Sequence, residues 1–154
     1  MTPHLVLPIT LTMTAAATLL NMWIARRVGQ VRMAHKVSVG DGGNEALARR
    51  MRAHANFVEY TPFFLILLAL IELARGSELW LWGVGVLYIV GRILHVFGME
   101  GKNRLRTIGI LVTMVVLLGL AVYALVIPYL ERGKLAGISY AATLQSWSGG
   151  TKLS

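Results

Sequence analysis

Four long apolar runs, separated by shorter polar segments, limit how this chain can fold more than any other feature. They cover approximately residues 5–25, 57–73, 79–97 and 108–130. Each is close to the ~20 residues that an α-helix needs to cross about 30 Å of hydrocarbon. None shows the alternation of a barrel strand, and backbone groups in lipid must be satisfied within helices or closed barrels. The runs therefore predict an all-α fold, an integral membrane four-helix bundle.

The composition agrees with a membrane protein, since 56% of the residues are apolar and only 14% are charged. The first run is not preceded by basic residues and is longer than a signal-peptide core, so we expect it to be retained as a helix. We expect one four-helix domain over residues 1–130 and a C-terminal tail over residues 131–154. The chain has no cysteine, so any thiol chemistry must use a thiol that a ligand brings.

The basic residues predict the orientation. Of the fifteen Lys and Arg, seven lie between the first and second runs and three between the third and fourth. By the positive-inside rule both segments should be cytoplasmic, with the second-to-third loop and both termini on the other side. The net charge of +8 then reflects topology and attraction to anionic lipids. Because these residues form no separate domain, a nucleic-acid partner is not expected. The short loops suit a bacterial inner membrane.

Local signals predict where the helices begin and end. The first helix should continue to about Lys36, and the glycines of the stretch 40–43 should then form a surface loop. A phosphate-binding loop is the alternative, but the stretch lacks the Gly-Lys-Ser/Thr ending. A second helix should start near Glu45 and run through Pro62, which membrane helices tolerate. In the third run Gly83, Gly85 and Gly91 should let another helix approach closely.

A polar row stands at the entrance to the second run, in the stretch RMRAHANFVEY (residues 50–60). At about 100° per residue, Arg52, Asn56 and Glu59 fall within a sector of about 60° on one helix face. Arg92 and His95 are three residues apart and share a face of the third run. We expect these side chains to meet in the cytoplasmic half of the bundle.

Arg32 and Arg106 should lie at the same level of the bundle. The resulting cluster would have several positive charges and one buried carboxylate, which suits a zwitterionic ligand with excess carboxylate. An unpaired carboxylate inside a span costs roughly 2.5–3.5 kcal/mol, so Glu59 should be paired, with Arg52 or Arg92 as partner. A purely structural ion pair is the alternative interpretation.

Other charged residues have simpler interpretations. We expect the side chains of Arg49, Arg50, Lys102 and Arg104 to extend from helix ends to the lipid headgroups. His95 alone would more often be a hydrogen-bonded core residue than a ligand-binding one. No HExxH motif and no paired histidines at ligand spacing occur, so no metal site is expected.

Three motifs together resemble the MAPEG family, the membrane-associated proteins in eicosanoid and glutathione metabolism. These are GQVR at residues 29–32, RAHANFVEYTPF at residues 52–63 and GRILH at residues 91–95. The similarity extends over about residues 26–129. It implies a homotrimer of four-helix subunits that binds glutathione, as co-substrate, in a cleft between neighbours near the cytoplasmic side.

The resemblance also implies roles for single residues. Arg32 and Arg52 would hold the glutathione carboxylates, Asn56 would hydrogen-bond the peptide, and Glu59 would contact the α-ammonium group. Arg92 and His95 would line the same cleft. Arg106 would be the catalytic arginine that stabilises the thiolate, beside Thr107, where some members have serine. The chain departs from the animal enzymes at three positions, where an arginine and two tyrosines are replaced by Ala55, Met99 and Ile110.

Two functions from different classes follow. The first is a trimeric membrane enzyme that activates glutathione for conjugation to lipophilic substrates, or for the reduction of their hydroperoxides. A cation beside a thiol favours the thiolate, which is the nucleophile. The second is a non-catalytic accessory subunit of a larger membrane assembly, whose polar cluster binds a lipid headgroup or pairs internally. A channel or transporter is weaker, because no continuous polar stripe or broken helix is evident.

Overall fold

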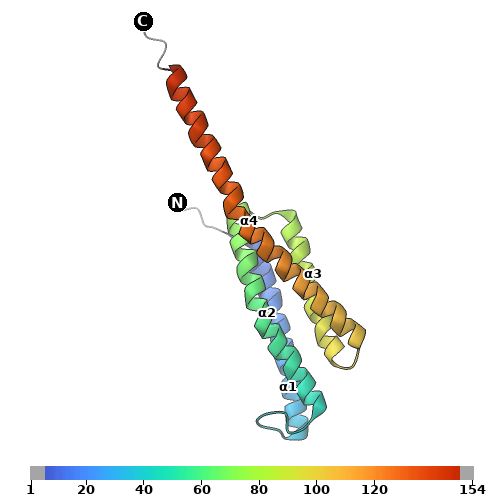
Figure 1. The fold of residues 1–154 in the computed structure, drawn as a ribbon. Helices are drawn as coiled ribbons and strands as arrows, with labels where there is room; N and C mark the ends of the chain where they lie inside the picture. The colour runs from blue at the N-terminus through green and yellow to red at the C-terminus, as the bar shows by residue number, and fades with distance from the viewer. Residues whose placement is uncertain (1–5, 150–154) are drawn as a thin grey trace. The chain divides into compact units, whose positions relative to one another are not determined.

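The computed structural model describes residues 6–149, with side chains to Leu130, and within this range it has four helices. They are α1 (Pro8–His35), α2 (Glu45–Arg75), α3 (Leu79–Met99) and α4 (Asn103–Gly149). Each is long and apolar enough to span a membrane, α4 over Asn103–Leu130. The predicted all-α fold with four candidate spans is confirmed (Figure 1).

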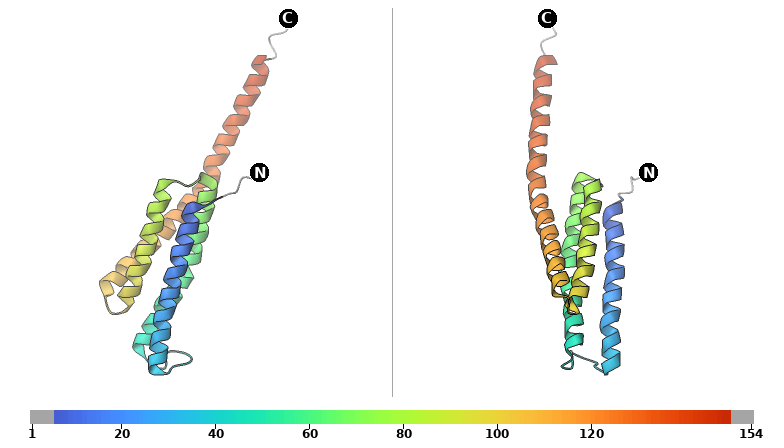
Figure 2. Two further views of the ribbon diagram at one scale, coloured as in Figure 1. Left: turned by 180° about the vertical axis from the view of Figure 1, so that it is seen from behind. Right: turned by 90° about the vertical axis from the view of Figure 1, so that its right-hand side faces the viewer.

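The chain divides into two compact units, Met1–Ala121 and Val122–Ser154. The first unit holds α1, α2, α3 and the start of α4. Consecutive helices alternate in direction in this unit, so the α1–α2 and α3–α4 loops lie at the same end (Figure 2). In the second unit, α4 continues as helix to Gly149. The predicted tail, residues 131–154, has its side chains and its last five residues outside the described part, and its boundary stays a prediction.

The core of the first unit lies between α1, α2 and α3. Ala17 and Ile24 from α1, Phe57 from α2 and Val96 from α3 form one buried cluster. Beyond Tyr60, the large side chains of α2 that face outward are apolar (Phe63, Ile66, Leu70 and Leu73), as expected of a helix in lipid or against another subunit. The predicted helix boundaries are confirmed, because α1 continues to His35 and α2 runs unbroken through Pro62.

Glycines act in two ways here. Gly40, Gly42 and Gly43 have positive φ angles, so the predicted loop between α1 and α2 is confirmed. Gly85 and Gly91 allow close packing: a Cβ at Gly85 would come within 2.7 Å of Met13 Sδ, and one at Gly91 within 2.7 Å of Val112 Cγ1. Within the single chain no helix approaches Gly83, because a Cβ there would meet nothing within 4 Å.

At the end opposite the α1–α2 loop, Glu72 joins α2 to the start of α1. Helix α1 has no side-chain cap of its own. The Glu72 carboxylate instead accepts the backbone N–H groups of Ile9 (3.0 Å) and Thr10 (2.8 Å) and the Thr10 hydroxyl (2.7 Å). Ser77 Oγ donates to it from the α2–α3 loop at 2.7 Å. One buried carboxylate therefore caps a helix whose second residue, Ile9, lies 63 residues earlier in the sequence.

Candidate functional site

The polar row on α2 forms as the helical spacing predicts. Arg52 Nη1 lies 3.5 Å from Glu59 Oε1, so the predicted pairing of Glu59 is confirmed, with Arg52 as partner. The expectation that Glu59 is a buried carboxylate was wrong for the single chain: its side chain is 48% exposed and that of Arg52 is 67% exposed. The reason is that this face of α2 is not covered by the other helices of the same chain. The row therefore presents one cation and one anion outward.

Arg92 on α3 joins this row from the inside. Its Nη1 donates to Asn56 Oδ1 at 2.9 Å, and its guanidinium lies over the Phe57 ring, 5.5 Å from the centroid. Only 1% of the residue is exposed, yet Nε and Nη2 have no hydrogen-bond partner in the part of the chain that the structure describes. A buried donor without an acceptor is costly. Arg92 thus offers two unused donors beside Asn56.

His95, one turn further along α3, is also buried and exposes only 3% of its surface. Its Nδ1 has no partner among the described residues. Its backbone lies against α4, since a Cβ at Gly109 would come within 2.6 Å of His95 N. His95 therefore stands at the contact between α3 and the first turns of α4.

Arg106 and Thr107 lie on the first turns of α4, and both are exposed. They line an open pocket together with Asn103, Ile110 and Leu111. Thr107 Oγ1 donates to the carbonyl of Asn103 at 3.1 Å, a common bond of threonine within a helix. Arg106 presents its charge at this open pocket.

The side chain of Arg32, another predicted site residue, is bound to the loop between α1 and α2. Its Nη1 donates to Gly40 O at 2.9 Å and to Ser38 O at 3.4 Å, and its Nη2 lies 3.3 Å from Met51 Sδ. These contacts close the loop between α1 and α2. Within the described residues Arg32 therefore organises the loop, and its hydrogen bonds do not reach Arg52, Asn56 or Glu59.

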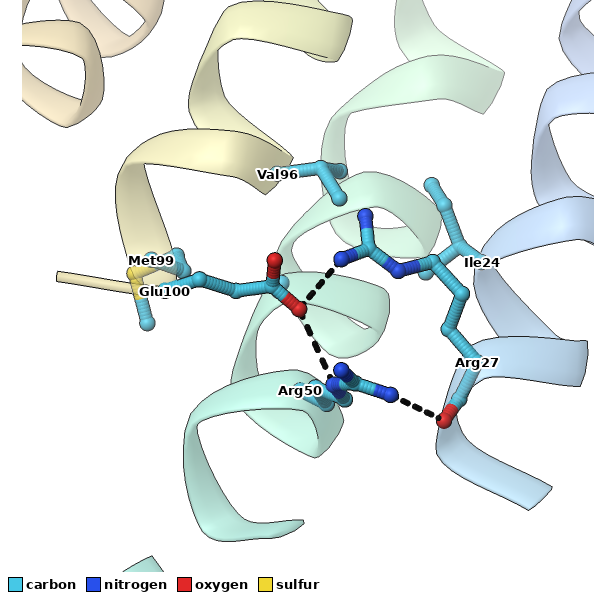
Figure 3. A pocket seen from close by; sticks show the side chains of 7 residues that line it. Ile24, Arg27, Arg50, Val96, Met99 and Glu100 are labelled. Carbon is cyan, nitrogen blue, oxygen red and sulfur yellow. Dashed lines mark hydrogen bonds and ion pairs between the residues drawn. The ribbon is translucent and has the colours of Figure 1, made fainter. Parts of the chain in front are cut away.

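The sequence did not reveal a second ionic cluster, centred on Glu100 just after α3 (Figure 3). Glu100 Oε1 forms ion pairs with Arg27 of α1 and, at 2.9 Å, with Arg50 Nε of α2. The prediction that Arg50 only extends to the headgroups was wrong, because it also donates to Arg27 O at 3.0 Å. The sequence signal that could have revealed it is Glu100 itself, an acid just after the third apolar run, at the end of the bundle where most of the arginines lie.

No group of three or more His, Asp or Glu side chains lies close enough to hold a metal ion in the residues that the structure describes. The chemistry that this site offers is that of guanidinium, amide and carboxylate groups. Such groups bind carboxylates and ammonium groups and stabilise anions.

Comparison of the sequence with known proteins identifies relatives and a family. The chain is 34% identical over 87 residues to the inner membrane protein YecN of Escherichia coli, both in strain K12 and in strain O6:H1. The aligned stretch covers 56% of this chain and 66% of YecN, slightly less than two thirds of that relative. The model of the MAPEG family matches residues 10–126, most of the chain and all of the candidate site residues. The protein therefore belongs to the MAPEG family.

Proposed function

We propose that the protein is a membrane-embedded, glutathione-dependent transferase or peroxidase that acts on lipophilic electrophiles or hydroperoxides. The observation that carries this proposal is the polar row of Arg52, Asn56 and Glu59 at the start of the second apolar run, together with Arg92 of α3, which bonds to Asn56 and has two unused donors. Membership of the MAPEG family supports glutathione as the ligand.

The charges of the row complement glutathione, which carries two carboxylates, one α-ammonium group and peptide amides. Arg52 and Arg92 supply guanidinium groups, which bind carboxylates through paired hydrogen bonds. Glu59 supplies an anion for the ammonium group, and the Asn56 side chain, already oriented by Arg92, can bond a peptide group. This set matches a zwitterion with excess negative charge better than it matches a neutral lipid.

Arg106 is the proposed catalytic residue. A fixed guanidinium beside the glutathione sulfur favours the thiolate, and arginine does not lose its own proton at neutral pH. In conjugation the thiolate forms a bond to an electrophilic carbon as the leaving group departs, and the thiol proton goes to water. In peroxide reduction two glutathione molecules are oxidised to the disulfide, while the hydroperoxide is reduced to an alcohol and water.

We propose a homotrimer, with the site between neighbouring copies. A charged side chain facing hydrocarbon costs roughly 2.5–3.5 kcal/mol near the centre of a span. Arg52 and Glu59 lie on an uncovered face of α2, so a second copy would shield them. The distribution of Lys and Arg, and the name of the related YecN, favour an inner membrane location with the α1–α2 and α3–α4 loops in the cytoplasm.

A second candidate is a non-catalytic accessory subunit. The observation that favours it is that Arg32 and Thr107 already have hydrogen-bond partners within their own chain. In that case the row on α2 would bind a lipid headgroup or a partner protein. Ala55, Met99 and Ile110, which replace residues of the animal enzymes, point the same way.

Glutathione binding decides between the two. We expect saturable binding to the detergent-purified protein by calorimetry, with an ultraviolet thiolate band near neutral pH. Arg106→Ala should lower turnover of a chlorinated aromatic electrophile by about 100-fold or more, since removal of one group that stabilises a developing anion costs about 10²–10³. Arg104→Ala is the matched control: Arg104 is an exposed arginine in the same turn, outside the pocket of Arg106. Equal effects of the two variants would refute the role of Arg106.

A further inference from the structure

The Glu100 cluster joins three helices at the end of the bundle where the candidate site lies. Glu100 follows the last residue of α3, Arg27 comes from α1, and Arg50 comes from α2. The side chains of the three residues are 13% to 30% exposed, so the charges are only partly screened by water. Figure 3 shows both guanidinium groups directed at the same carboxylate oxygen.

Aromatic rings fix the position of Arg27 in this cluster. Its guanidinium lies 4.6 Å from the Trp23 ring centroid and 5.3 Å from that of Phe97. Phe97 belongs to the last turn of α3, three residues before Glu100. Arg27 therefore holds the end of α3 by a cation–π contact as well as by an ion pair.

The turn that carries Glu100 also determines where Arg106 lies. Lys102 N donates to Gly98 O at 3.1 Å, and Arg106 N donates to Lys102 O at 3.2 Å. Gly98 is packed so closely that a Cβ there would overlap the backbone of Arg106. The end of α3 and the first turn of α4 are therefore one tightly packed piece, and Glu100 anchors it to α1 and α2.

We propose that Glu100 is a positioning residue: through Arg27 and Arg50 it fixes the α3–α4 turn and so holds Arg106 at the glutathione sulfur. This inference rests on the proposed function. Of the residues that would bind the rest of glutathione, Arg52, Asn56 and Glu59 lie on α2. Arg92 lies on α3 eight residues before Glu100 and is held by its own bond to Asn56, so none of the four belongs to the turn. Loss of the anchor should therefore affect thiolate formation far more than glutathione affinity.

The test compares Glu100→Gln with Glu45→Gln. Glu45 also pairs with an arginine, Arg49, at 2.5 Å, but within one helix and on an exposed surface, so this pair connects no separate elements. In Glu100→Gln we expect turnover to fall at least about tenfold, because small displacements of a catalytic group have such effects. The pH at which the thiolate band appears should rise, and the Kd for glutathione should change less than about threefold. Glu100→Asp, which keeps the charge, should restore part of the turnover.

A second measurement does not depend on glutathione. Because the chain has no cysteine, spin labels can be placed at Ala46→Cys and Lys102→Cys, two exposed positions on α2 and on the turn. The distance distribution between them should broaden in Glu100→Gln and not in Glu45→Gln. An unchanged distribution, or a parallel loss of glutathione affinity and turnover, would overturn the proposal. If the parent protein binds no glutathione, the proposed function fails, while the label distances still decide whether Glu100 is the anchor.

Discussion

Replacing Glu72 by glutamine should destabilise the start of α1 although the two side chains have nearly the same shape. Glu72 is 2% exposed, and its two carboxylate oxygens accept four hydrogen bonds. Two of the donors are the backbone N–H groups of Ile9 and Thr10, which no other residue of the helix can satisfy. The other two are hydroxyl groups, which can rotate.

The magnitude follows from counting acceptors. In Glu72→Gln the amide oxygen can still accept from one of the two backbone N–H groups. The amide nitrogen is itself a donor, so it cannot accept from the second backbone N–H. The hydroxyl groups of Thr10 and Ser77 can turn to accept from that nitrogen, so the net loss is one buried N–H without a partner and the charge of the acceptor. Together these cost about 2–3 kcal/mol, since one unsatisfied buried donor alone costs about 1–3 kcal/mol.

Two measurements test this. The apparent melting temperature in detergent should fall in Glu72→Gln. The amides of Ile9 and Thr10 should exchange with deuterium faster in the variant than in the parent protein, while the amides in the middle of α1 should exchange at the same rate in both. Glu78→Gln is the control, because Glu78 accepts one exposed hydrogen bond, from Trp80 Nε1 at 2.7 Å, and surface changes of this kind usually stay within about 0.5 kcal/mol. Equal melting temperatures for the two variants, with unchanged exchange at Ile9 and Thr10, would refute the reasoning.

Two further predictions concern the site and its packing. Glu59→Gln should weaken glutathione binding by about tenfold or more while the melting temperature stays nearly constant, since Glu59 is half exposed and pairs with Arg52 at 3.5 Å; loss of folding instead would favour a structural ion pair. Gly98→Ala should cost about 1–3 kcal/mol in thermal unfolding, because the new Cβ meets backbone atoms of Arg106, whereas Gly83→Ala meets nothing within 4 Å and should be neutral or stabilising.

The helices could be predicted from the sequence because their signals are local. Apolar runs of the length of a span, glycines with positive φ after Lys36 and helix-forming residues from Glu45 all act over a few positions. The sequence also predicted the pairing of Arg52 with Glu59, because both lie on one helix and the helical period alone relates them.

Contacts between helices could not be predicted in this way. Glu72 caps a helix 63 residues away, and Glu100 pairs with arginines of two other helices. Nothing in the local pattern of an arginine near a helix end tells whether it reaches a headgroup or an acid on a neighbouring helix. The exposure of Glu59 was missed for a related reason, since apolarity along the sequence does not indicate which face of α2 another helix covers.

The use of acids across the chain gives a reason to regard Glu59 as exceptional. Six acids have described side chains, and each has a polar partner: Asp41, Glu45, Glu59, Glu72, Glu78 and Glu100. Glu72 and Glu100 join separate helices, and Asp41, Glu45 and Glu78 bond to close neighbours at loops or helix ends. Glu59 and Glu72 both lie within the second apolar run. Of the described acids in that run, only Glu59 pairs solely with its own helix and remains half exposed. A carboxylate so placed connects no separate elements of its own chain, and this is why we propose that Glu59 binds a group from outside the chain.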